Sequence, residues 1–306
     1  MSDLRRDFVH AEGCPVCSSR RFHPCKKGNL DFARLHADQV KITDSEYGRI
    51  WDLSECGDCG HIFADPSPDP GFILSLYRRV EDPVYDDEAE GRSRNFVGIL
   101  RNLEGLVPSK GRLFDVGAAT GILVRLARDR GWEAQGIEPS TWAAKYAAEK
   151  YGLSLLNGSF EDAALRPGAD RAVTMIDFIE HTARPREAAA KAAEILAPGG
   201  ILCLVTPDVH STAARLAGRR WWHFRPGHLA YFSERSLAIL LGDAGLKIVL
   251  RRKYAWTFSL HYLLSRKPAF RILMGSPKAS SFFKRISLKL ALGDSFEIYA
   301  QKDGGA

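Results

Sequence analysis

The residues best suited to chemistry are a glycine-bounded turn and a carboxylate 23 positions after the start of that turn. The turn, Asp115-Val116-Gly117-Ala118-Ala119-Thr120-Gly121, follows an apolar run typical of a buried parallel strand. Its glycines let the backbone turn sharply and approach a ligand at the N-terminus of a helix expected over Ile122–Arg130. The next expected strand, Trp132–Ile137, ends at Glu138. A carboxylate at this offset accepts from ribose hydroxyls in nucleotide-binding βαβ units, so the pair predicts a nucleotide-like ligand.

Four cysteines form a second constellation near the start of the chain. Cys14 pairs with Cys17 and Cys56 with Cys59 in two Cys-x-x-Cys knuckles separated by 38 residues. Each knuckle presents two thiolates to one metal ion, and two knuckles complete the tetrahedral shell that zinc prefers. Only six cysteines in a chain of 306 residues argue against a disulfide scaffold. The spacing therefore predicts a structural zinc site.

The composition is that of a soluble globular protein, with 45% hydrophobic and 26% charged residues. The length predicts about two domains, and the proline-rich stretch Asp65–Pro70 divides a zinc-binding domain, 1–68, from a larger domain, 69–306. Neither a signal peptide nor a run of apolar residues long enough to span a bilayer is evident. We therefore expect a cytoplasmic protein.

The net charge of +6 is unevenly distributed. Residues 245–293 contain eleven Lys or Arg and no Asp or Glu, which indicates an anionic partner. Within them, 251–293 is too long for a hairpin loop. Phe282, Ile286 and Leu290 recur at helical spacing, and Tyr254–Leu264 is rich in aromatic residues and leucine, so we expect a basic amphipathic helix. The segment is a candidate for contact with the inner membrane face, for a lid over an anionic acceptor, or for a packed insertion.

Three segments, taken together, resemble the successive motifs of class I S-adenosylmethionine (SAM) dependent methyltransferases. They are the turn itself, Gly136-Ile137-Glu138-Pro139-Ser140, and Leu196-Ala197-Pro198-Gly199-Gly200-Ile201-Leu202. The resemblance covers roughly 95–250 and the last expected strand. One departure is Ala119, which stands where the family usually has its middle glycine. A nicotinamide-binding domain is disfavoured because Gly-x-Gly-x-x-Gly is absent.

The resemblance implies an α/β fold: a Rossmann-like, seven-stranded methyltransferase sheet with one antiparallel edge strand. A small N-terminal zinc ribbon would precede this sheet, and a basic helical insertion, 251–293, would precede the last strand. The Cys56–Pro66 segment is similar to the ribbon of a bacterial branch that often acts on sugars or secondary metabolites. The remaining strands are expected over Leu153–Leu156, Arg171–Ile176, Ile201–Val205, Leu246–Leu250 and Asp294–Gln301.

The resemblance also implies which residues hold SAM. Phe160 would offer an apolar face to the adenine and Glu161 an acceptor for its amine, while Tyr77 or Tyr85 would line the pocket from a cap. The full expected set is Asp115, Gly117, Ala118, Gly121, Glu138, Pro139, Phe160, Glu161, Asp177 and Phe178.

Three histidines are candidates for a catalytic base. His181 lies just beyond the carboxyl end of an expected central strand, where open α/β sheets bind ligands. His223 and His228 belong to Arg219–Phe232, a stretch of tryptophans, histidines and arginines that reads as a substrate-facing loop and resembles an aromatic segment over the active site in this branch. Aromatic packing that orders this stretch is the alternative.

The expected function is SAM-dependent methylation, most directly of oxygen, on a small-molecule or carbohydrate acceptor. Phosphorylated, nucleotide-linked and lipid-linked forms of this acceptor are all candidates. The expected cofactors are SAM and structural Zn²⁺, and the expected partner is an anionic small molecule or saccharide. An RNA methyltransferase is one alternative, disfavoured because the ribbon is not strongly basic. A non-catalytic SAM-binding or zinc-binding module is the other.

Overall fold

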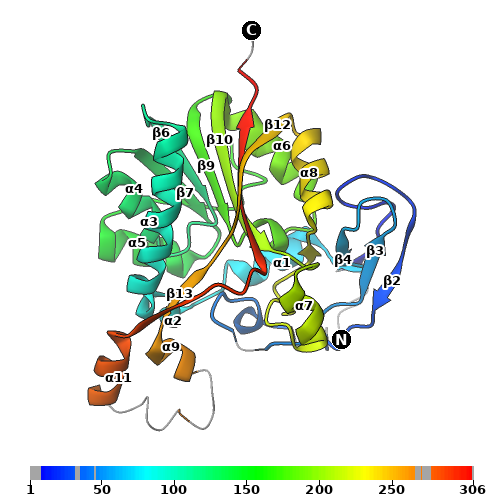
Figure 1. Ribbon diagram of the computed structural model, residues 1–306, viewed down its shortest axis with the longest axis horizontal. Coiled ribbons are helices and arrows are strands. Elements are labelled where there is room, and N and C mark those ends of the chain that lie inside the picture. The colour runs from blue at the N-terminus through cyan, green and yellow to red at the C-terminus, as the bar shows by residue number, and fades with distance from the viewer. Residues whose placement is uncertain (1–7, 32–34, 45, 266–269, 271–276, 305–306) are drawn as a thin grey trace.

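The computed structural model describes residues 8–31, 35–44, 46–265, 270 and 277–304. A seven-stranded sheet lies at its centre (Figure 1). From one edge to the other its strands are β12 (Leu246–Lys253), β15 (Ser295–Lys302), β10 (Leu196–Pro207), β9 (Asp170–Ile176), β6 (Arg112–Val116), β7 (Glu133–Glu138) and β8 (Leu156–Asn157). The five strands from β10 to β8 pair in parallel, whereas β15 is antiparallel to both neighbours. The expected seven-stranded sheet is confirmed.

The reversed strand is not where we expected it. β15 lies between β10 and β12, so the edge position belongs to β12. Residues 295–300 of β15 are all buried, which suits a strand paired on both sides. Only Leu246 of β12 is fully buried, Ile248 and Leu250 are half-buried, and the strand ends in the exposed Arg251-Arg252-Lys253. Charged residues of this kind are common on the edge strand of a sheet.

The strand β8 is also shorter than the expected Leu153–Leu156. Leu153 and Leu155 are buried against the core before the strand begins. Their apolar side chains therefore serve packing, and pairing with β7 is confined to Leu156 and Asn157.

Helices cover both faces of the sheet (Figure 1). On one face lie α3 (Ala89–Leu106), α4 (Ile122–Asp129) and α5 (Thr141–Tyr151), and on the other lie α6 (Pro185–Ile195) and α8 (Glu234–Asp243). Two separate apolar clusters lie between the sheet and these helices, one on each face. Side chains of β10 alternate between them: Cys203 packs in the cluster of α3, α4 and α5, and Leu202 packs in the cluster of α6 and α8. This double burial explains why the central strands are nearly all apolar.

Local sequence sets the ends of these helices. The Ser140 hydroxyl accepts from the Ala143 N–H at the start of α5, and Gly152 ends the helix with φ of 64°. Ser233 forms a capping box with Ser236 at the start of α8. Such caps satisfy backbone groups that have no partner inside the helix.

The N-terminal part is a small antiparallel sheet of β2 (Phe22–Lys26), β3 (Leu53–Cys56) and β4 (Ile62–Ala64), with a fourth strand, β11 (Ala230–Tyr231), from the larger part. A separate pair joins β1 (Phe8–Val9) to β5 (Ser67–Pro68). Trp51 and Tyr231 are buried in one apolar cluster. The ribbon and the larger part thus share a sheet and a core, while a domain boundary near residue 68 stays a prediction.

Two short helices, α1 (Pro70–Tyr77) and α2 (Pro83–Asp87), connect the ribbon to α3. The carboxylate of Asp69 caps α1 by accepting from the N–H groups of Gly71 and Phe72. Other short helical elements are α7 (Thr212–Ala217) and the 3₁₀ turns at Ala37–Gln39, Ile179–His181 and Gly218–Arg220.

The basic insertion is only partly helical. It contains β13 (Trp256–Ser259), α9 (Leu260–Ser265), α11 (Pro277–Lys284) and β14 (Ser287–Leu290). β13 and β14 form an antiparallel pair that projects beyond the central sheet (Figure 1). The expected helix from Phe282 through Leu290 is wrong, because α11 ends at Lys284 and Ser287-Leu288-Lys289-Leu290 alternates as a strand does. The stretches 266–269 and 271–276 of the expected insertion lie outside the described residues. Among the described residues, no helix combines the length and apolar character needed to cross a membrane.

Candidate functional site

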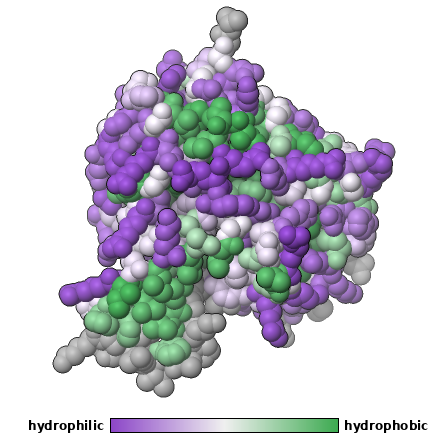
Figure 2. All heavy atoms as spheres, in the orientation of Figure 1, coloured by the Kyte–Doolittle hydropathy of each residue, from purple (hydrophilic) through white to green (hydrophobic). Residues whose placement is uncertain are grey.

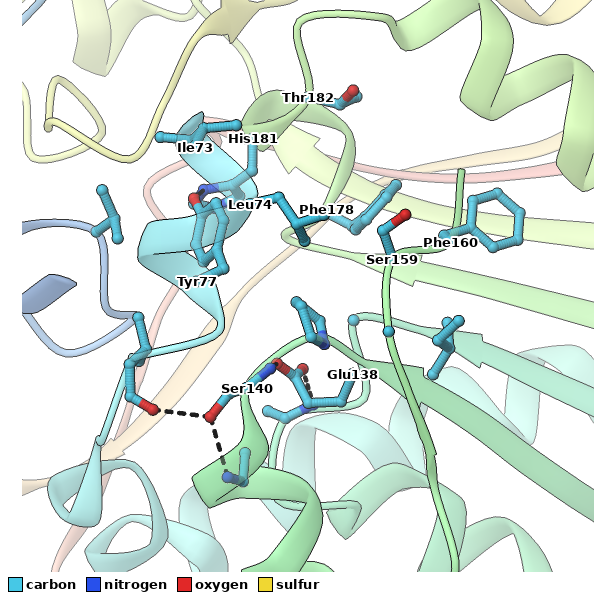
Figure 3. Close-up of a pocket in the computed structure, with 18 of the residues that line it drawn as sticks. Ile73, Leu74, Tyr77, Glu138, Ser140, Ser159, Phe160, Phe178, His181 and Thr182 are labelled. Carbon is cyan, nitrogen blue, oxygen red and sulfur yellow. Dashed lines mark hydrogen bonds between the residues drawn. The ribbon is translucent and has the colours of Figure 1, made fainter. Parts of the chain in front are cut away.

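A cavity of about 400 Å³ lies beyond the carboxyl ends of β6, β7 and β9 (Figure 3). This is the side of an open α/β sheet where ligands bind. Helix α1 and the ribbon residues Val40, Lys41 and Ile42 cover it from the other side. Of the expected SAM-binding residues, those that line the cavity are Gly117, Glu138, Pro139, Phe160, Glu161, Asp177 and Phe178.

The glycine turn after β6 adopts left-handed backbone conformations at three positions. Gly117 has φ of 72°, Ala119 of 46° and Gly121 of 78°. A side chain at Gly117 would lie 3.3 Å from the Phe178 ring, so glycine keeps the cavity open there. The N–H groups of Gly117 and Ala118 both donate to the carbonyl of Ile137 at 3.0 Å and so are already used. The Thr120 hydroxyl is buried at the cavity and has no hydrogen-bond partner in the part of the chain that the structure describes.

Glu138 is fixed by the backbone on both sides of its carboxylate. Its Oε2 accepts from the Ala119 N–H and its Oε1 from the Ser140 N–H, both at 2.8 Å. Figure 3 shows it held at the cavity beside Ser140. Burial raises the pKa of Glu138 to about 7. Each oxygen keeps a lone pair, so the carboxylate can still accept from two ligand hydroxyls.

Two aspartates accompany Glu138. Asp115 accepts from the Thr174 hydroxyl at 2.5 Å and, with Ala118, lines a small adjoining cavity of about 40 Å³. Asp177 follows β9 with φ of 49° and borders both cavities. Burial raises the pKa of Asp115 and that of Asp177 to about 7.

The remaining expected cofactor residues divide between lining and support. Phe160 and Phe178 meet edge to face with centroids 6.1 Å apart and form an apolar wall (Figure 3). Glu161 is exposed at the rim. Gly121 does not line either cavity; it begins α4, and a side chain there would lie 2.8 Å from Leu153. Its role is to let that helix pack closely.

Among the candidate bases, only His181 lines the cavity. The Tyr77 hydroxyl lies 2.7 Å from its Nδ1 and donates to the Gly227 carbonyl at 3.4 Å (Figure 3). In the tautomer with the proton on Nδ1, His181 donates to the tyrosine oxygen, the tyrosine donates to Gly227, and Nε2 keeps its lone pair; in the other tautomer the tyrosine donates to Nδ1 and Nε2 carries the proton. Burial, with the positive charge of Arg225, lowers the pKa of His181 to about 3, so the ring is neutral near pH 7.

His228 and His223 lie behind His181. The ring of His228 is 4.7 Å from that of His181 and 6.0 Å from that of His223, measured between centroids. His223 Nε2 lies 3.5 Å from a carboxylate oxygen of Asp294. Burial lowers the pKa of both His228 and His223. Neither ring borders the cavity.

No residue of the stretch Arg219–Phe232 lines the 400 Å³ cavity, and a substrate-facing role for this stretch stays a prediction. Trp221 is fully buried, and its indole N–H donates to Asp294 at 3.0 Å. Tyr231 is 1% exposed and pairs through β11 with the ribbon. The aromatic residues pack the core between the two parts of the chain, as the alternative interpretation had it.

The four cysteines of the two knuckles converge. Sγ of Cys14 lies 3.5 Å from that of Cys59, and Sγ of Cys17 lies 3.6 Å from that of Cys56. All four sulfurs lie within 4.8 Å of one another. Zn–S bonds of about 2.3 Å in a tetrahedron place sulfurs about 3.8 Å apart, so the cluster is compatible with a zinc ribbon.

Residues 89–251 match the family described as a methyltransferase domain, which covers more than half of the chain and includes the glycine turn, Glu138 and the aromatic wall. The chain belongs to this family. Two curated relatives are uncharacterized methyltransferases. The one from Staphylococcus carnosus is 28% identical over 110 residues, 34% of this chain and 52% of the relative. The one from Oceanobacillus iheyensis is 27% identical over 128 residues, 39% of this chain and 60% of the relative. The matches thus span little more than half of each relative.

The methyltransferase fold is also that of a solved SAM-dependent methyltransferase from Archaeoglobus fulgidus. That structure matches with a TM-score of 0.50 and 14% sequence identity, covering 72% of this chain and 98% of its own. At this identity the likeness concerns the fold alone.

Several cavity residues of this methyltransferase domain and its ribbon were missed by sequence reasoning. Arg225 is half-buried, donates to the Asp44 carboxylate, and also donates to the carbonyls of Lys41 and Ile42 at 3.1 and 2.8 Å. It thereby holds the ribbon segment that lines the cavity. No sequence pattern links these residues, since they are about 180 positions apart. Trp142 also lines the cavity, and its place in the first turn after the Ser140 cap was a usable signal.

Proposed function

We propose that the protein transfers a methyl group from SAM to a small-molecule or carbohydrate acceptor, with a hydroxyl oxygen as the methylated atom. The observation that carries the proposal is Glu138, a buried carboxylate aimed at a large cavity within a methyltransferase domain. Because backbone N–H groups already fix both oxygens, the carboxylate is positioned before any ligand arrives. A preorganised acceptor pair is what a ribose diol requires.

The other lining residues fit the remaining parts of SAM. Phe160 and Phe178 offer apolar surface for an adenine, and Glu161 at the rim offers an acceptor for its amine. Gly117 and the unpartnered Thr120 hydroxyl lie where the turn approaches the cavity, and Asp177 borders it from β9. When bound, SAM supplies an activated methyl group on its sulfonium, so the protein has chiefly to align the acceptor and exclude water.

His181 is the residue that we assign to proton removal from the acceptor. It lines the cavity, and in the tautomer with the proton on Nδ1, held by the Tyr77–Gly227 chain, its Nε2 lone pair is free. A neutral imidazole can accept the proton of a hydroxyl as the new bond forms. His228 and His223 are positioning residues behind it in this assignment.

The four cysteines would hold zinc in a closed structural site, which supplies folding free energy and takes no part in the chemistry. The ion would fix the ribbon, and with it Val40, Lys41 and Ile42 at the cavity. Cysteine thiolates persist in a reducing compartment, in keeping with a cytoplasmic location.

The projecting part of the insertion is our candidate for contact with an anionic or lipid-linked acceptor at the inner membrane face. Exposed apolar side chains gather on this part: Phe282 is 60% exposed, Leu288 40% and Leu292 50%. Figure 2 shows the apolar surface of the same projection. Arg251 and Lys253 at its base pair with Glu234 and Asp208, which leaves fewer free cations than the composition indicates. This favours a mixed apolar and basic surface over a nucleic-acid groove.

A screen of methyl transfer from labelled SAM tests the proposal, with nucleotide sugars, lipid-linked saccharides and RNA as acceptors. We expect label in a saccharide or another small hydroxylated acceptor. RNA labelling, with steeply salt-dependent RNA binding, would instead favour the nucleic-acid alternative. SAM binding with no acceptor labelled by wild type would favour a non-catalytic module.

A further inference from the structure

Three potential metal ligands meet at the inner end of the cavity, apart from the four cysteines. They are Glu180 and His181, from the 3₁₀ turn after β9, and His228, from the segment before β11. One ligand atom of each lies within 4.8 Å of those of the other two. Glu180 is 1% exposed and His228 3%, while His181 borders the cavity.

Two of these residues have a buried polar atom that has no hydrogen-bond partner among the described residues. The atoms are Oε1 of Glu180 and Nδ1 of His228. Buried polar atoms in folded proteins nearly always have a hydrogen-bond partner. A buried polar atom without one has lost its hydrogen bonds to water and gained none within the protein. Two such atoms in one cluster indicate that something binds between them.

The opposite atoms of the cluster are already engaged. The Thr206 hydroxyl donates to Glu180 Oε2 at 2.9 Å, and His181 Nδ1 is hydrogen-bonded to the Tyr77 hydroxyl at 2.7 Å. Ligands of a metal ion are commonly held in this way, with the far atom of each side chain fixed by a second residue. The arrangement leaves Glu180 Oε1 and His181 Nε2 as the free lone pairs.

The charges around Glu180 also favour a bound cation. Within the part of the chain that the structure describes, no Lys or Arg nitrogen forms an ion pair with Glu180, and the half-buried Arg225 nearby is paired with Asp44. A buried carboxylate beside two neutral imidazoles lacks a positive charge, and a divalent cation supplies one.

We propose that Glu180, His181 and His228 bind a divalent transition-metal ion, with Zn²⁺ as the first choice. Two histidines and one glutamate are a ligand set of catalytic zinc sites, and two histidines with one carboxylate also suit Fe²⁺. The proposal rests on the proposed function at the same cavity and replaces its base: the ion would polarise an acceptor oxygen, and His181 would bind the ion through Nε2 in place of accepting a proton. Its test does not depend on methyl transfer.

Metal content measures the site directly. The purified full-length protein is equilibrated with Zn²⁺, freed of unbound metal by gel filtration, and analysed for zinc per chain. We expect two zinc ions for wild type and one for Glu180→Gln and for His228→Ala. The matched control is His223→Asn, which changes the neighbouring imidazole outside the cluster and should keep two.

Loading with Co²⁺ identifies which ion is lost. Four thiolates give cobalt an intense charge-transfer absorption that a histidine and glutamate site lacks, so both variants should keep this band while losing one equivalent of metal. Glu180→Gln is nearly isosteric, and circular dichroism checks that it folds if His228→Ala does not. Equal metal content in wild type and folded Glu180→Gln would overturn the proposal, whether or not any acceptor is methylated.

Discussion

The Ala119 N–H donates to Glu138 Oε2 at 2.8 Å, so the turn after β6 and the end of β7 are joined at the cavity. The contact requires the left-handed conformation of Ala119, whose φ is 46°. The residue that departs from the usual glycine of the family is therefore also the one that orients the carboxylate.

Replacing Ala119 with glycine should stabilise the protein. A left-handed conformation costs an alanine about 1–2 kcal/mol, and glycine removes this cost. The greater conformational freedom of glycine in the unfolded chain offsets about 0.4–1 kcal/mol of that stabilisation. We expect the free energy of unfolding in urea to rise by about 0.5–1 kcal/mol. The control Ala118→Gly, at a buried alanine without positive φ, should lower it. A decrease for Ala119→Gly would show that its methyl group packs more favourably than we infer.

The contribution of Asp115 to the free energy of unfolding should fall as the pH rises from about 5 to 7. The folded-state pKa of Asp115, about 7, lies above that of an unfolded carboxyl, so in this window the folded chain binds more protons than the unfolded one. One such group contributes a slope of up to about −1.4 kcal/mol per pH unit. Asp115→Asn should reduce the slope measured by urea unfolding, since its amide oxygen can still accept from Thr174. The exposed Glu149→Gln should leave the slope unchanged, and an unchanged slope in both variants refutes the assignment.

His181→Ala should lower kcat without lowering the affinity for SAM. A positioned base contributes about 10²–10⁴ in rate, and His181 is not among the residues to which we assign SAM binding. We expect kcat to fall by about that factor while the Kd for SAM, from calorimetry, stays within about twofold. Tyr77→Phe, which removes only the hydroxyl beside Nδ1, should give a smaller loss. A His181→Ala enzyme with wild-type kcat would exclude this residue.

Removing metal from the cysteine cluster should destabilise the whole chain at once. The ribbon sheet contains β11, and Trp51 and Tyr231 share one core, so the two parts should unfold together. Calorimetry should record a single transition that moves to lower temperature after treatment with a chelator. Cys25→Ser, at a cysteine outside the cluster, should keep the metal and the Tm. Two resolved transitions, only one of them sensitive to chelator, would contradict a shared core.

Sequence reasoning worked where the decisive contacts are local. Gly117, Glu138 and the Ser140 cap lie within a few residues of the strand ends that they define, and strand, turn and cap patterns predict such features. The two cysteine knuckles are local as well, and their convergence followed from the chemistry of a four-thiolate site.

Sequence reasoning failed where distant partners decide the outcome. Trp221 and Tyr231 read equally well as a binding loop or as core, and only their packing against the ribbon, more than 150 positions away, distinguishes the two. Leu290 fits a helical wheel with Phe282, but pairing with Trp256 in β13 makes it part of a strand. The pairing of Arg225 with Asp44 has no sequence signal at all.

Calorimetric titration of SAM tests the central claim most directly, by comparing Glu138→Ala with Glu133→Ala, a change at the exposed start of the same strand. Glu138→Ala removes charged hydrogen bonds of about 1.5–3 kcal/mol each, so the Kd for SAM should rise by at least about tenfold. Glu133→Ala should bind SAM as wild type does. A folded Glu138→Ala protein that binds SAM with wild-type affinity would contradict the account.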